Sequence, residues 1–243
     1  MKNFICSITI GLIFLLPSRE IADKKSNFNE AVITGAWYNE SDPGEVLLAI
    51  DNYLVFTKFN LKSKIFYHTW GGPYTISSDK LKIQIEFDSK NKENVGKPVE
   101  LSVTGLTDLI VIKGIEPGAI SMKRTDDGKA PLAGNWRISG RKQGETMAEI
   151  PLRARRTLKL LTGTRFQWMA INIETGEFSG TGGGTYTFKN GKYTEHIEFF
   201  SRDSSRVGAA LTFDGKIEKE EWHHSGLSSR GEPIYEIWVR HKL

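Results

Sequence analysis

The chain contains the same β-rich pattern twice, and this duplication limits what it can fold into. Residues 52–96 align without a gap on residues 164–208 at a constant offset of 112, and fourteen of these 45 positions are identical. Each half begins with Gly-x-Trp and ends in a stretch that carries an arginine; these residues are Gly35-Ala36-Trp37 with Arg124, and Gly134-Asn135-Trp136 with Arg240. We therefore interpret the chain as one duplicated domain.

The first residues predict a signal peptide. A short basic start is followed by a mostly apolar stretch without acidic residues, from Phe4 to Pro17. This length suits the apolar region of a secretory signal and is short for a membrane span. We expect cleavage of residues 1–18, with Ala22 as a second choice of site, and a periplasmic or secreted protein with no membrane span left. A buried N-terminal helix is the alternative.

The remaining chain is almost entirely of strand type. Apolar and polar residues alternate, and turn pairs recur at roughly the 8–12 residue spacing of sandwiches and barrels. The clearest hairpin lies at Asn190-Gly191, because Asn-Gly accepts the two positive φ values of a type I′ turn. Asp214-Gly215 and Thr162-Gly163 predict further turns, and Thr175-Gly176 predicts a slightly longer loop. No segment has a helical period, so we predict an all-β protein.

The Gly-x-Trp starts and the late arginines resemble the structural signature of the lipocalin, or calycin, superfamily. The resemblance implies two tandem antiparallel up-and-down lipocalin-like β-barrels, at residues 30–125 and 132–243, joined by a polar linker at 126–131. It also implies that each tryptophan packs across one barrel end under its arginine, Trp37 under Arg124 and Trp136 under Arg240. Such a cation–π contact is worth about 0.5–2 kcal/mol. The second half resembles lipocalin-like domains of exported bacterial proteins, which imply no assigned activity.

Charge and cysteine content argue against a nucleic-acid partner and against a disulfide. Residues 19–131 carry 15 basic and 16 acidic side chains, and residues 132–243 carry 17 and 13, so we expect no nucleic-acid partner. The basic cluster at 153–156 is interpreted as an exposed strand or connector, the alternative being a basic lip that attracts an acidic ligand. The single cysteine, Cys6, lies in the expected signal peptide, so the mature protein has no disulfide.

Hairpin geometry around Asn190-Gly191 separates the two faces of the second barrel. A two-residue turn places Tyr186 opposite Glu195 and puts both on one sheet face. This predicted inner face is apolar and aromatic except for Glu195; it consists of Gly182, Gly184, Tyr186, Phe188, Tyr193, Glu195, Ile197 and Phe199. The same construction in the first half places Tyr74, Ile76, Leu81, Ile83, Ile85 and Phe87 inside, so Ile83 corresponds to Glu195.

A carboxylate inside an apolar barrel must be hydrogen-bonded, paired or protonated. We expect Tyr186 to be the hydrogen-bond partner of Glu195. Two interpretations stay open. Glu195 is a site residue, or it is a structural acid satisfied by Tyr186 or by an arginine from a neighbouring strand.

The expected Asp214-Gly215 turn supplies another wall of the barrel. It places Val207 opposite Trp222, with Leu211, Phe213 and His224 on the same face, while Phe166, Trp168 and Ala170 face inward from an earlier strand. Aromatic walls with a few polar groups are typical of a small-molecule site. The predicted ligand-binding residues are Trp168, Tyr186, Glu195, Trp222 and His224.

Structural interpretations stay open beside this one. Trp168 and Trp222 can simply fill the barrel, and His224 can lie at its mouth, bonded to backbone. Adjacent histidines on a strand, such as His223 and His224, point to opposite faces, so we predict no metal site and no cofactor. Haem inside the barrel is a minor variant for which the sequence singles out no proximal histidine.

Three functions remain open. The first is an exported protein that binds a small, partly apolar ligand in the second barrel. The second is an isomerase or hydrolase in which Glu195 is the acid or base, Tyr186 tunes it and His224 carries the complementary proton. The sequence contains no nucleophile elbow, metal triad or cofactor loop, so no catalytic residue is assigned. The third is a module with filled barrels that acts through its surface on an envelope protein partner.

Overall fold

The computed structural model describes residues 30–115, 117–228 and 231–242, so the predicted signal peptide lies outside the described residues. Strands make up 65% of the described chain and helices only 4%, which confirms the all-β prediction. Within these ranges, no helix has the length and apolar character needed to cross a membrane.

The first repeat forms a closed antiparallel barrel of eight strands, counting β5 and β6 as one interrupted strand. Each strand pairs with the next along the chain, and β1 closes the ring by pairing with β9. Its elements are α1 (Glu30–Ile33), β1 (Gly35–Asn39), β2 (Glu45–Ile50), β3 (Tyr53–Asn60), β4 (Ile65–Ser77), β5 (Lys80–Gln84), β6 (Phe87–Asp88), η1 (Lys92–Asn94), β7 (Pro98–Leu106), β8 (Leu109–Lys113) and β9 (Ala119–Asp126).

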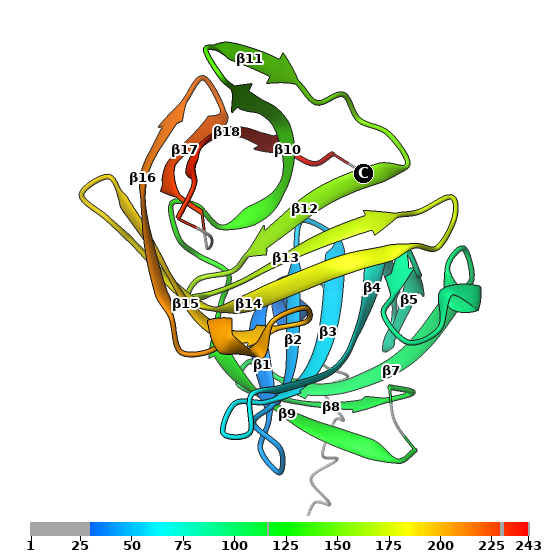
Figure 1. The fold of residues 1–243 in the computed structure, drawn as a ribbon. Helices are drawn as coiled ribbons and strands as arrows, with labels where there is room; N and C mark the ends of the chain where they lie inside the picture. Colours follow the sequence, from blue (N-terminus) through cyan, green and yellow to red (C-terminus); the bar gives the residue numbers. More distant parts are fainter. Residues whose placement is uncertain (1–29, 116, 229–230, 243) are drawn as a thin grey trace, which may run out of the picture.

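The second repeat forms a second eight-stranded barrel, which β10 closes by pairing with both β12 and β18. Figure 1 looks into this barrel, with the first barrel below it. A short extra strand, β11, extends β10 as a hairpin that the first repeat lacks. The elements are β10 (Gly134–Gln143), β11 (Thr146–Glu149), β12 (Arg155–Leu161), β13 (Arg165–Asn172), β14 (Phe178–Lys189), β15 (Lys192–Phe200), η2 (Ser204–Arg206), β16 (Ala210–Glu218), β17 (Glu221–Leu227) and β18 (Pro233–Arg240).

Both barrels are closed at one end by the same tryptophan–arginine pair. The guanidinium of Arg124 lies 4.1 Å from the ring centroid of Trp37, and that of Arg240 lies 4.0 Å from Trp136. Each indole Nε1 donates a 2.8 Å hydrogen bond to the carbonyl four residues earlier. The arginines also donate to backbone carbonyls at the start of their own barrel. The arrangement therefore ties the first and last strands of each repeat together.

A bulge in β15 changes the predicted inner face. Tyr186 pairs with Glu195 and Gly184 with Ile197 as predicted, but the register then shifts, so Gly183 pairs with Phe199 and Gly182 with Phe200. The prediction that Phe199 points inward is therefore wrong. In the first barrel the β5 strand is interrupted at the equivalent place, and Phe87 likewise belongs to the core between the barrels.

The predicted hairpin at Asp214-Gly215 is also wrong, because both residues lie within β16. The turn is at Lys219 and Glu220, which have φ values of 51° and 66°, and Ile217 rather than Val207 pairs with Trp222. Gly215 suits this place in the strand, since a Cβ there would lie tightly, 3.1 Å from the ring of Phe188 and 3.4 Å from the indole nitrogen of Trp222. The glycine thus makes room for aromatic packing.

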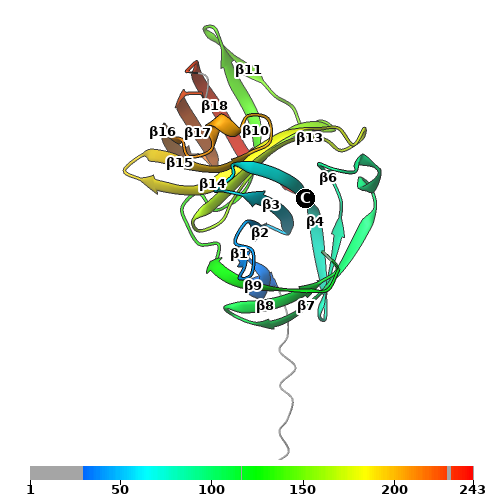
Figure 2. The same cartoon turned by 60° about the horizontal axis from the view of Figure 1, so that its bottom comes forward.

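The two barrels share a hydrophobic core between their walls. In both ribbon views, strands β12–β14 of the second barrel lie against β2–β4 of the first (Figures 1 and 2). Phe66 stacks near Phe199, and the repeat-equivalent pair Phe178 and Phe87 does the same; both pairs have centroids 6.2 Å apart. These two phenylalanine contacts are therefore exchanged with one another when the repeats are exchanged, as in a two-fold symmetric interface.

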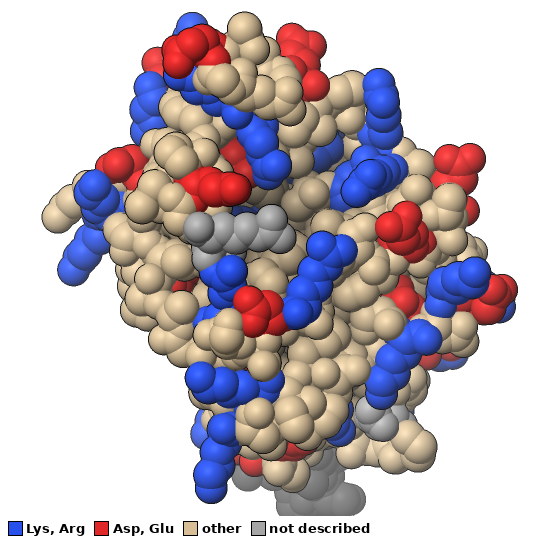
Figure 3. Space-filling model, viewed as in Figure 1, with Lys and Arg blue, Asp and Glu red and all other residues tan. Residues whose placement is uncertain are grey.

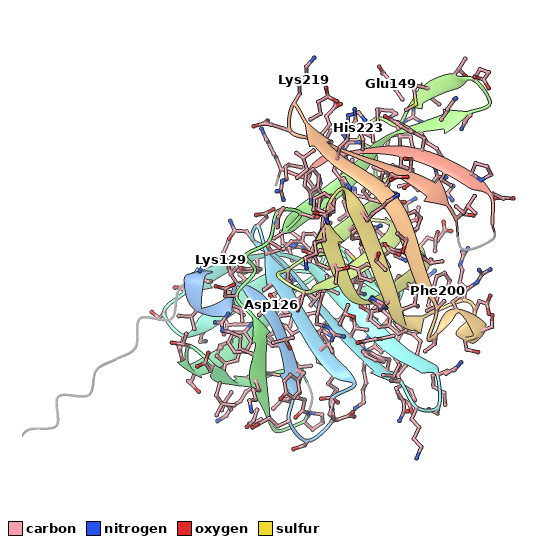
Figure 4. The ribbon with its side chains drawn as sticks, turned by 90° about the vertical axis from the view of Figure 1, so that its left-hand side faces the viewer. Asp126, Lys129, Glu149, Phe200, Lys219 and His223 are labelled. Atoms are coloured by element: carbon pink, nitrogen blue, oxygen red, sulfur yellow. The ribbon has the colours of Figure 1, made fainter. Side chains whose placement is uncertain are left out.

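Polar contacts fix the barrels to one another. The buried amide of Gln167 accepts a 2.7 Å hydrogen bond from Thr57 and donates to Thr69 at 3.0 Å. Asp126, at the end of β9, accepts bonds of 2.7–2.9 Å from the turn at 162–164 of the second barrel. Figure 4 shows Asp126 at the junction of the two barrels. The bonds to Asp126 connect the end of the first barrel to a turn of the second.

Candidate functional site

The interior of the second barrel contains a cavity of about 320 Å³. Its walls come from β10, β12, β13, β15, β16, β17 and β18, and most of its lining side chains are apolar or aromatic. Five lining residues are charged or titratable; they are Arg141, Lys159, Glu195, His224 and Glu236. A concave, mostly apolar space with a few polar groups is the usual form of a small-molecule site.

Lys159 and Glu195 form a buried ion pair in this cavity. The ammonium Nζ of Lys159 lies 2.9 Å from Glu195 Oε1, and each residue is only 5% exposed. The hydroxyl of Tyr193 donates to the same carboxylate oxygen at 3.0 Å. Burial, followed by the nearby Glu195 charge, raises the pKa of Tyr193 well above its ordinary value, so this hydroxyl stays protonated and acts as a donor.

The predicted hydrogen bond between Tyr186 and Glu195 is therefore wrong. The Tyr186 hydroxyl donates to the carbonyl oxygen of Thr162 at 2.7 Å instead. The two residues do face each other across the β14–β15 ladder, but a tyrosine ring is long and its hydroxyl reaches past the neighbouring side chain. The enzyme hypothesis requires a hydrogen bond through which Tyr186 tunes Glu195. The structure lacks that bond.

Aromatic rings surround the ammonium group of Lys159. Its Nζ lies 5.0 Å from the ring centroid of Trp238, 5.3 Å from those of Tyr193 and Trp222, and 5.9 Å from that of Phe166. Ring faces attract cations, and this attraction is stronger where water is excluded. The rings and the Glu195 carboxylate together stabilise a cation that burial alone would destabilise.

A second charged group lies on the neighbouring wall. Glu236 accepts bonds from Arg141 through Oε1, at 2.5 and 3.1 Å, and from the Trp238 indole through Oε2 at 3.1 Å. Burial works to raise the pKa of Glu236, but the contact with His224 and the charges of Arg141 and Lys159 together lower it to about 2. Glu236 is therefore ionised and paired at neutral pH.

His224 is the most enclosed titratable group in the cavity wall, at 2% exposed. Its Nδ1 lies 3.4 Å from Glu236 Oε2, and its ring packs 4.2 Å from Phe213. Within the described residues, neither ring nitrogen makes a hydrogen bond. Burial lowers the pKa of His224, Glu236 opposes this change, and Lys159 lowers the pKa further. The imidazole is therefore neutral near pH 7.

The structure separates the five predicted ligand-binding residues into two groups. Trp168, Glu195 and His224 line the cavity. Trp168 packs edge-to-face on Phe200, with centroids 5.4 Å apart. Tyr186 and the fully buried Trp222 instead belong to the aromatic core of the same barrel. Lys159, Glu236 and Arg141 are part of the charged lining that the sequence reasoning missed.

The first barrel has aliphatic residues where the second has these charged ones. Strand register places Lys159, Glu195 and His224 at the positions of Leu47, Ile83 and Ile112, each 112 residues earlier in the sequence. Likewise His224 pairs with Glu236 as Ile112 pairs with Ile120. All four first-barrel residues are buried in one continuous core. The same barrel fold therefore forms with either polar or aliphatic residues at these four positions.

Elsewhere the described surface is less specialised. On the face shown in Figure 3, acidic and basic side chains are interspersed. A groove of about 450 Å³ lies outside the second barrel between β11 and its neighbours, and its lining includes Arg137, Met147 and Ile237. Among the described residues, no group of three or more His, Cys, Asp or Glu side chains is placed to hold a metal ion.

Comparisons with known proteins add little to this geometry. No family model matches the chain, and no curated protein matches it. Among solved structures, the chain is similar to a lipocalin-like protein from Bacteroides uniformis, with 13% sequence identity and a TM-score of 0.34. That similarity covers 46% of this chain and 100% of the other. The strand pairing and the tryptophan–arginine closures described above make the fold a tandem of two lipocalin-like barrels.

Proposed function

We propose that the protein is an exported lipocalin-like protein that binds a small, partly apolar molecule inside its second barrel. The observation that carries the proposal is the placement of buried charge. Lys159, Glu195, His224 and Glu236 border a cavity in one barrel, whereas the equivalent positions of the other barrel hold leucine and isoleucine.

Energetics favour a binding role for these groups over a purely structural one. Replacing a buried ion pair by apolar residues of similar volume is often neutral or stabilising, by up to about 4 kcal/mol. Leu47 and Ile83 are such a replacement within the same chain. The ion pair is therefore a costly way to fill the barrel and a useful way to orient a ligand.

Native mass spectrometry tests the proposal directly. The parent protein is incubated with an extract of small molecules and compared with the double variant Lys159→Leu, Glu195→Ile, which copies the first barrel. A second variant, Ala170→Leu, keeps the charges but fills the cavity, since Ala170 lines it. We expect an added mass on the parent that both variants lose. Retention of that mass by both variants would place binding elsewhere and overturn the proposal.

Export is a separate part of the proposal, supported by the basic start and apolar stretch of residues 1–17. Expression of the full chain in a bacterial host, followed by fractionation and N-terminal sequencing, tests it. We expect a periplasmic or secreted product that begins near residue 19. A product that stays in the cytoplasm with its first residues intact would contradict export without affecting the binding proposal.

A further inference from the structure

The ion pair in the cavity leaves both acceptor and donor capacity unused. The hydrogen bonds from Lys159 and Tyr193 to the Glu195 carboxylate both go to Oε1, and among the described residues none reaches Oε2. An ammonium has three N–H donors, and Lys159 uses one of them in a hydrogen bond. An unused acceptor therefore lies next to unused donors on the same cavity wall.

The charges that line the cavity already balance. Lys159 is matched by Glu195, and Arg141 by Glu236, while His224 is neutral because burial lowers its pKa. An ionised ligand would bring one more charge against this largely apolar wall, where each described charged side chain is already paired. Desolvating an unmatched charge is strongly unfavourable. The balance therefore favours a neutral ligand.

The remaining lining favours an aromatic ligand body. Trp168, Phe200, Phe213 and Trp238 contribute rings to the cavity wall, and Leu211 and Ile234 contribute aliphatic surface. Aromatic side chains bind other rings in offset-stacked or edge-to-face arrangements that add to the gain from burial. A flat ring system in the cavity can make both kinds of contact.

We propose, on the basis of the function proposed above, that the ligand is a neutral aromatic molecule with one hydroxyl or carboxamide group that bridges Glu195 and Lys159. The group donates a hydrogen bond to Glu195 Oε2 and accepts one from Lys159 Nζ. A hydroxyl does both through one oxygen, and a carboxamide does so through its N–H and its carbonyl. The ring system lies against Trp168 and Phe200.

A matched series of naphthalene probes tests this ligand class by isothermal titration calorimetry on the full mature chain. 2-Naphthol donates and accepts, 2-methoxynaphthalene lacks the donor, 2-naphthoate is an anion, and 2-(aminomethyl)naphthalene is a cation. We expect 2-naphthol to bind the parent about 10- to 100-fold more tightly than the methyl ether, because hydrogen bonds to charged groups are the stronger ones. Both ionised probes should bind more weakly than 2-naphthol.

Two variants separate the possible failures. In Lys159→Leu, Glu195→Ile the preference for 2-naphthol over its ether should disappear, whereas Ala170→Leu should weaken all four probes. Equal binding of 2-naphthol and the ether to the parent, or tighter binding of an ionised probe, overturns the ligand class. If Ala170→Leu still weakens binding in that case, the function proposed above stands. Probes that bind equally to parent and Ala170→Leu, or do not bind at all, count against both.

Discussion

Lys159 and Glu195 behave as one unit at the scale of single residues, because each neutralises the other in a water-poor interior. We expect Lys159→Leu or Glu195→Ile alone to lower the free energy of unfolding by about 3–5 kcal/mol, since each leaves an unpaired buried charge. The double variant should be as stable as the parent or more stable. Urea denaturation of all four proteins at pH 7 measures the cycle. Additive losses would show that the pair does not interact.

Two buried histidines make stability depend on pH. Burial, with smaller contributions from Arg156 and Arg137, lowers the pKa of His241 from 6.5 to about 4, and the pKa of His224 is also lowered. Between pH 6.5 and 4 the unfolded chain binds protons that the folded chain does not, so stability falls as the pH falls. Denaturation midpoints at pH 7 and 4.5 should show a smaller loss for His241→Phe than for the parent. Equal losses would refute this assignment.

Part of the site could be predicted residue by residue, and part could not. The inward direction of Glu195 follows from alternation along a strand next to a well-defined turn. Its partner does not, because Lys159 lies on β12, which pairs with β10 and β13 and meets β15 only across the closed barrel. Ladder register predicts neighbours within a sheet, whereas contacts through a lumen depend on how the barrel closes.

At the scale of elements, the β16–β17 hairpin contains a correctable strain. Lys219 and Glu220 both have positive φ, a conformation that costs an ordinary L-residue roughly 1–2 kcal/mol. Figure 4 shows Lys219 at the tip of this hairpin, and both turn residues are exposed. The double variant Lys219→Asn, Glu220→Gly should raise stability by about 1 kcal/mol. Thermal unfolding checks this; a lower midpoint would contradict the strain argument.

The same hairpin explains why a turn can be misplaced and a face still be correct. Moving the turn from Asp214-Gly215 to Lys219-Glu220 shifts the pairing by an even number of residues, so Trp222 and His224 still face inward. The β15 bulge adds a single residue and therefore has the opposite effect, turning Phe199 to the other face. Alternation along a strand still predicts the correct face when a turn is misplaced by an even number of residues. It cannot reveal a one-residue bulge.

At the scale of the molecule, the barrels unfold together if their shared core is essential to both. Phe199 of the second barrel packs 4.8 Å from Phe59 of the first, centroid to centroid. We expect one cooperative transition by both circular dichroism and tryptophan fluorescence, and a loss of about 3–5 kcal/mol in Phe199→Ala. Separate transitions by the two probes would show that each barrel is stable alone.

The duplication predicts two barrels, but not how they pack. Alternation along the strands predicts that Phe87 and Phe199 face the barrel interiors, but both lie in the core between the barrels. The Gly-x-Trp motifs and the constant offset reflect contacts within one repeat, so they can be recognised directly in the sequence. Packing between repeats depends on which apolar residues lie on the outer faces. The bulge in β15 and the interruption between β5 and β6 decide this for Phe199 and Phe87.

The matched phenylalanine pairs between the barrels resemble the interface of a symmetric dimer. This bears on how one barrel alone can come to have charged residues in its lumen. In an assembly of two identical chains, every substitution occurs twice, so a polar lumen would be present in both subunits. Fusing the repeats into one polypeptide removes that constraint. One barrel keeps a buried apolar interior without these charges. The other barrel can contain buried charged residues that destabilise it. Such substitutions are not repeated in the first barrel, which stays attached through the same polypeptide.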